Sequence, residues 1–215
     1  MPVLIWAVFI AGAIASRYFF GMQGRLAYAA MVFIAILLFR RQLTIGLTHL
    51  ASRWGLMKAT IDKMPTSIRL APANAMDEVA KPSAAELSAA GFIDAGAWNI
   101  PPMPKIRLAL MVHPVENFLA AIETASSIGA QVNIHTLYAD GSVVTYTNSR
   151  LPAPKAQRPE QKFVRMPGAA PATLFSRARN ERRGDGISAL TAQDAPNLYE
   201  RLYADSIRYR KAHGA

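Results

Sequence analysis

The sequence predicts an N-terminal two-helix transmembrane hairpin followed by a soluble α+β domain. We expect that domain to be an antiparallel β-meander of three to five strands with helices on one face. The N-terminal part has two apolar runs, at residues 3–15 and 26–39. Farther along, residues 105–113 alternate between apolar and other side chains, and residues 131–148 have the pattern of a β-hairpin. Helical patterns precede and follow these strands, which favours a mixed domain.

The hairpin prediction depends on the length of the two apolar runs. Crossing a hydrocarbon layer of about 30 Å takes about 20 apolar residues. Neither run reaches that length alone. Within the segment 1–41 we therefore expect two short helices, at about residues 2–21 and about residues 25–40, whose charged ends lie at the membrane interfaces. Residues 27–39 carry no charge, and a helix that is apolar all round is buried or faces lipid. A buried helix pair in a soluble protein and a signal peptide are the alternatives.

Basic and aromatic side chains mark the expected membrane interfaces. These membrane-interface residues are Arg17, Arg25, Arg40, Arg41, Arg53 and Trp54. More basic residues follow the second run than separate the two runs, which favours cytoplasmic termini and a cytoplasmic C-terminal domain at an inner membrane. Residues 1–63 carry a net charge of +6, out of +10 for the chain. This excess would attract anionic headgroups of the lipid bilayer, so the charge does not require a nucleic acid.

Between the hairpin and the domain, the sequence predicts two connecting segments. Residues 42–63 form an amphipathic juxtamembrane helix, which either lies on the membrane surface or continues the second helix. The alternative is a helix packed on the soluble domain. Residues 64–82 contain three prolines and little periodicity, so they are expected to form a linker. The soluble domain is expected at residues 83–215, beginning with a capping box at Ser83 and Glu86.

Within the domain, the strongest local signal is the hairpin turn at Asp140 and Gly141. This dipeptide supplies the positive φ angles of tight turns. Residues 115–125 fit either a helix or a strand, with the strand slightly favoured because a β pair follows. Residues 162–166 suggest an edge strand. Helices are expected at residues 171–183 and from about residue 194 to about residue 211.

No motif in the sequence identifies catalytic, cofactor-binding or metal-binding residues, and we expect no cofactor. The chain has no cysteine, which excludes disulfides, thiol chemistry and cysteine metal sites. The best candidate for a functional surface is a group of arginines at the end of the predicted helix 171–183, which suits an acidic partner or another anion. The alternative is a solvated helix end. The group consists of Arg177, Arg179, Arg182 and Arg183.

These patterns predict a non-catalytic accessory or scaffold subunit of a bacterial-type inner-membrane complex, such as a respiratory, photosynthetic or transport assembly. Its partners would be integral membrane proteins, because short apolar helices gain specificity from neighbouring helices rather than from lipid. One alternative is a membrane-tethered enzyme or ligand-binding domain, with a site formed by His113, His135 and Tyr146. A weaker alternative is a membrane-anchored nucleic-acid binder that uses the arginine group.

Overall fold

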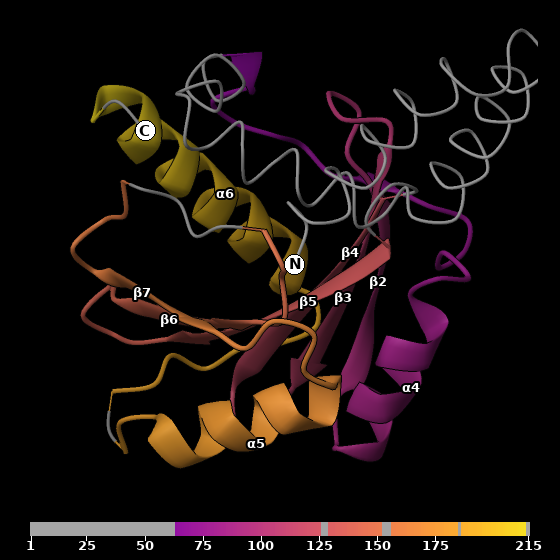
Figure 1. The fold of residues 1–215 in the computed structure, drawn as a ribbon, viewed down its shortest axis with the longest axis vertical. Coiled ribbons are helices and arrows are strands. Elements are labelled where there is room, and N and C mark those ends of the chain that lie inside the picture. Colours follow the sequence, from indigo (N-terminus) through magenta and orange to yellow (C-terminus); the bar gives the residue numbers. More distant parts are fainter. Residues whose placement is uncertain (1–62, 126–128, 152–155, 185, 214–215) are drawn as a thin grey trace, which may run out of the picture. The chain divides into compact units, whose positions relative to one another are not determined.

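The computed structural model describes residues 63–125, 129–151, 156–184 and 186–213 (Figure 1). The predicted transmembrane hairpin, residues 1–41, lies outside these residues. So does the predicted juxtamembrane helix, apart from Lys63. Within the described part of the chain, no helix is both long and apolar enough to cross a membrane.

The described residues form an α+β domain around a seven-stranded sheet whose strands follow one another in chain order. Every neighbouring pair is antiparallel except the last, in which β6 and β7 run parallel. The predicted α+β fold class is therefore confirmed, but the sheet has more strands than the three to five that the sequence predicts. The strands are β1 Ala71–Pro72, β2 Ile93–Asn99, β3 Ile106–His113, β4 Phe118–Ala125, β5 Gly129–Leu137, β6 Val143–Thr147 and β7 Gln161–Arg165.

Helices cover both faces of the sheet, not one face as predicted (Figure 1). On one face lie α4, Lys81–Ala89, and α5, Pro171–Glu181; on the other lies α6, Ala195–Ala212. The reason is the central strand β3, where every residue from Leu108 to His113 is buried. Ala109 and Met111 lie on the face of β3 opposite to Leu108 and Leu110, and they pack beneath α4 and α5. Because both sides of this strand are apolar, each needs a covering layer.

Several local predictions are confirmed. Residues 118–125 form a strand, and the turn between β5 and β6 contains Gly141 at a φ of +79°. The predicted edge strand is β7, although its parallel pairing with β6 was not expected. A hairpin turn cannot make a parallel pair, so the chain after β6 has to return to the opposite end of the sheet before β7 begins.

The start of the domain differs from the prediction. The helix α4 begins at Lys81 with Ala80 as its N-cap and without a side-chain cap hydrogen bond, so Ser83 and Glu86 do not form the expected capping box. Pro82 instead occupies the first turn, where its missing N–H costs nothing. The segment 64–82, predicted as a linker, contributes β1 and places the buried side chain of Ile68 beneath α6.

Candidate functional site

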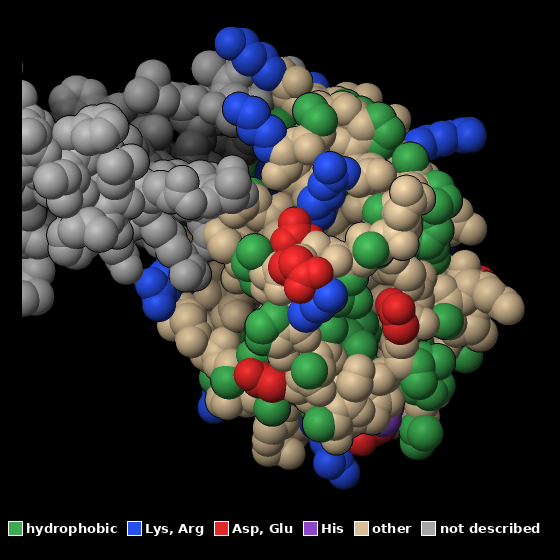
Figure 2. Space-filling view, turned by 90° about the vertical axis from the view of Figure 1, so that its right-hand side faces the viewer, with side chains coloured by type: hydrophobic (Ala, Val, Ile, Leu, Met, Phe, Trp, Pro, Cys, Tyr) green, Lys and Arg blue, Asp and Glu red, His purple; other side chains and the backbone are tan. Residues whose placement is uncertain are grey.

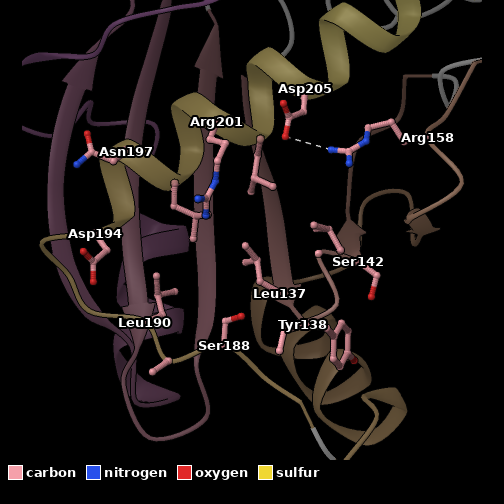
Figure 3. Close-up of a pocket in the computed structure, with 16 residues that line it drawn as sticks. Leu137, Tyr138, Ser142, Arg158, Ser188, Leu190, Asp194, Asn197, Arg201 and Asp205 are labelled. Carbon is pink, nitrogen blue, oxygen red and sulfur yellow. Dashed lines mark hydrogen bonds and ion pairs between the residues drawn. The ribbon is translucent and has the colours of Figure 1, made fainter.

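A cavity of about 570 Å³ lies between the first half of α6 and the end of the sheet where β5 turns into β6 (Figure 3). Its apolar side chains come from the strand ends, from the chain before α6 and from α6 itself, and they are Leu137, Val143, Leu190, Leu198 and Leu202. Its polar and charged side chains are Ser142, Arg158, Ser188, Asp194, Asn197, Arg201 and Asp205. The cavity is thus a mixed surface with leucines beside guanidinium, carboxylate, hydroxyl and amide groups.

Two structural elements place these side chains. Asn197, Arg201 and Asp205 are four residues apart on α6, and that spacing brings them to one side of the helix. The chain before α6 pairs with the end of β5, where the Ser188 N–H donates to the Leu137 carbonyl over 3.0 Å. This pairing brings Ser188 and Leu190 to the cavity (Figure 3).

The charges in the cavity are unequally paired. Arg158 contacts Asp205 over 3.1 Å and Glu160 over 3.5 Å. The carboxylate of Asp194 accepts a hydrogen bond from the Thr191 hydroxyl over 2.5 Å. Arg201 is exposed, and it forms no hydrogen bond or ion pair with any residue that the structure describes. Figure 3 shows its guanidinium reaching from α6 toward the middle of the cavity.

The predicted arginine group is placed at the end of α5 and just after it, and all four members contact carboxylates. Arg177 pairs with Glu181, and Arg183 pairs with Asp140 over 3.1 Å. Glu116, in the turn between β3 and β4, forms ion pairs with Arg179 over 3.1 Å and with Arg182 over 3.2 Å. Two of the arginines also contact aromatic rings, Arg182 over Phe118 and Arg183 over Tyr138. These contacts connect the helix end to two turns of the sheet.

The pairing changes the electrostatics expected of this group. Hydrogen bonds from Ser142 and then the nearby Arg183 guanidinium hold the pKa of Asp140 below its ordinary value. Arg177 likewise lowers the pKa of Glu181. The lowered pKa values favour the ionised forms of Asp140 and Glu181 beside these guanidinium groups. On the side of the domain shown in Figure 2, acidic and basic side chains are interspersed, and no continuous basic area covers that side of the described residues.

The two strand histidines do not share a site. In the sheet register His113 lies beside Phe118, and Phe118 lies beside Thr136, so these three side chains point to one face. His135 is the neighbour of Thr136 on β5, and its side chain therefore points to the opposite face of the sheet. Tyr146 packs on the α4 and α5 face and donates a hydrogen bond to Glu181 over 3.1 Å. A pocket formed by both imidazoles is therefore geometrically excluded.

Both histidines have local partners. The Nδ1 atom of His113 accepts a hydrogen bond from the Glu116 N–H over 3.2 Å, and the ring stacks on Phe175. His135 contacts the Thr145 hydroxyl over 3.0 Å, and burial lowers the pKa of His135 from 6.5 to about 4. At neutral pH, His135 is therefore an uncharged member of the core.

A second buried polar group lies on the α6 face. The carboxyl of Glu123 accepts hydrogen bonds from the Tyr199 hydroxyl over 2.9 Å and from the Asn133 amide over 3.1 Å. Burial raises the pKa of Glu123, while the hydrogen bonds from Tyr199 and Asn133 act in the opposite direction. These contacts fasten α6 to β4 and β5.

Only some of the predicted site residues belong to the part of the chain that the structure describes. The membrane-interface residues lie outside the described residues, and they are Arg17, Arg25, Arg40, Arg41, Arg53 and Trp54. The sequence reasoning missed Arg158 and Arg201, whose meeting at one cavity depends on tertiary contacts. No described set of three or more His, Asp or Glu side chains is placed to hold a metal ion. Comparison of the chain with protein-family models, curated proteins and solved structures finds no match.

Proposed function

We propose that the chain is a membrane-anchored, non-catalytic accessory subunit of an inner-membrane protein complex. The observation that carries the proposal is the pair of apolar runs at residues 3–15 and 26–39. Their transfer from water to hydrocarbon is favourable, and their modest length favours packing against helices of a partner. Basic residues after the second run favour a cytoplasmic position for the α+β domain and attraction to anionic headgroups.

The described domain supports this role through its surface. The arginine group at the end of α5 is largely balanced by carboxylates, which weakens the case for nucleic-acid binding relative to the sequence alone.

The anchor is tested by fractionation of cells that produce the full chain. We expect the chain to stay in the membrane pellet after an alkaline carbonate wash. The variant Ile34→Asp puts a carboxylate into the middle of the second run, and that change costs about 3 kcal/mol at the centre of a bilayer. This variant should move partly to the supernatant, whereas the matched control Ile34→Leu should not. A wild-type chain that stays soluble without detergent would overturn the proposal.

The accessory role is tested separately. Extraction in a mild detergent, followed by sizing and identification of co-purifying proteins, should show a particle larger than the chain in its micelle. A particle containing only this chain would contradict the accessory role while leaving the anchor intact.

The cavity favours a second candidate function, a membrane-tethered ligand-binding domain. Its volume of about 570 Å³ falls within the range of small-molecule sites. The site differs from the one predicted from His113, His135 and Tyr146. In this reading, the anchor would hold the binding domain beside the membrane, and the bound molecule would report to a membrane partner.

A further inference from the structure

From the cavity between α6 and the β5–β6 turn, we infer a binding site for a small organic anion. Arg201 holds the acidic group of the ligand, and the apolar body of the ligand lies against Leu198 and Leu202. The inference rests on the second candidate function above and specifies its ligand class. It does not depend on how the N-terminal residues contact the membrane.

The size and lining of the cavity suit a small molecule. Small-molecule sites typically combine a concave apolar surface with a few polar groups that fix orientation. Leu198 and Leu202 both line the cavity and pack on the core of the α6 face, and the half-buried Leu202 is the more accessible of the two. Leu137 lies opposite them at the end of β5.

Arg201 brings an unbalanced positive charge to the cavity. Every other charged side chain in the lining has a described partner, because Arg158 pairs with Asp205 and the carboxylate of Asp194 accepts from Thr191. Asp205 is one turn from Arg201 on α6, and its carboxylate points instead to Arg158 (Figure 3). A guanidinium presents a planar set of donors that matches the two oxygens of a carboxylate or phosphate.

Two uncharged polar side chains also line the cavity. The Ser188 hydroxyl and the Asn197 amide have no hydrogen-bond partner among the described residues, and both line the cavity. In Figure 3 the Ser188 hydroxyl lies below the Arg201 guanidinium, whereas the Asn197 amide points away from it. Arg201 and Ser188 can therefore offer a charged and a neutral donor to one anionic group, and the leucines beside them can contact the remainder of the molecule.

The test uses the full-length chain in a non-ionic detergent, titrated with phenyl phosphate as the probe and followed by calorimetry. Phenylacetate distinguishes a carboxylate from a phosphate head, inorganic phosphate supplies the head alone, and phenol supplies the apolar part alone. We expect saturable binding of phenyl phosphate or phenylacetate, weaker binding of inorganic phosphate and no saturable binding of phenol. If neither aromatic anion binds, or if phenol binds equally well, the inference is wrong.

Three variants locate the site. Arg201→Gln should weaken binding of the aromatic anion about tenfold or more, because it removes a charge-assisted contact. The matched control Arg208→Gln, an exposed arginine farther along α6, should bind like the wild type. Leu202→Ser should weaken binding of the aromatic anion and leave the affinity for inorganic phosphate unchanged. Equal binding by Arg201→Gln and Arg208→Gln would overturn the assignment, whereas the carbonate wash tests the anchor independently.

Discussion

The two faces of the sheet are buried by different kinds of side chain. Beneath α4 and α5 the core is mainly apolar and aromatic, with Phe92, Phe118 and Phe175 in edge-to-face contact and the His113 ring packed against them. Beneath α6 the core is apolar only around β3 and the start of β4, and farther along it contains Glu123 and His135. An ionisable carboxyl in a buried layer lowers the apolar content of that layer, so we expect the first face to contribute more to the stability than the second.

The largest expected effect comes from the core beneath α5. Leu174 is fully buried there, so Leu174→Ala should lower the free energy of unfolding by about 4 kcal/mol, through lost burial and an unfilled cavity. Leu198→Ala on α6 should cost about 2 kcal/mol, because this residue already borders open space. Denaturant titration of the full chain in mild detergent measures both. Equal losses would break the comparison between the faces.

The next effect is the pH dependence of stability that results from burial of the neutral His135 imidazole. Its folded pKa of about 4 lies below the ordinary 6.5, so the unfolded chain takes up this proton first as the pH falls. The stability that the neutral imidazole contributes is complete above pH 6.5 and is lost as the pH falls toward about 4, by up to about 3 kcal/mol. His135→Gln should flatten this part of the stability profile. Parallel profiles for the variant and the wild type would contradict the assignment.

A smaller effect is expected at Gly91, which follows α4. Its φ is +98°, and an added Cβ would lie 2.8 Å from the Nε2 atom of His113. Gly91→Ala should therefore cost about 2 kcal/mol, from backbone strain and from displacement of the imidazole. Gly184→Ala is the matched control, because no atom lies within 4 Å of its added Cβ. Thermal unfolding distinguishes the two variants. Similar melting temperatures would show that the His113 ring can move aside at little cost in stability.

The smallest effect is expected at Arg182. It pairs with Glu116 over 3.2 Å and lies over the Phe118 ring, and its side chain is 26% exposed. Arg182→Gln should cost about 1 kcal/mol, since partly exposed ion pairs and cation–π contacts contribute little individually. Arg208→Gln should leave the stability unchanged. A loss as large as that of Leu174→Ala would show that the arginine group, not the apolar layer, dominates this face.

The features that the sequence predicts well are those encoded locally. The turn at Asp140 and Gly141 needs only its own dipeptide, and the strand at residues 106–113 follows from alternation. The second covering layer was missed because Ala109 and Met111 alternate with larger apolar residues, which resembles a strand with one buried face. Alanine and methionine on the other face are ambiguous until the packing is known.

The site was less predictable because its members are far apart in the chain. Arg158 meets Asp205 across 47 positions, and Arg183 meets Asp140 across 43. The arginine group could be found from local composition, but its carboxylate partners could not. Arg201 has no motif of its own, since one cation between two leucines on a helix is ordinary. Its unpaired charge becomes visible only when the partners of Arg158 and Asp194 are known.

The contacts at the end of α5 also have a consequence for biosynthesis. Arg182 binds the turn after β3 and Arg183 binds the turn after β5, and both turns leave the ribosome before this helix does. The helix can reach its full set of ion pairs only after both hairpins have formed side by side. Docking of the end of α5 therefore depends on parts of the sheet that are synthesised before it.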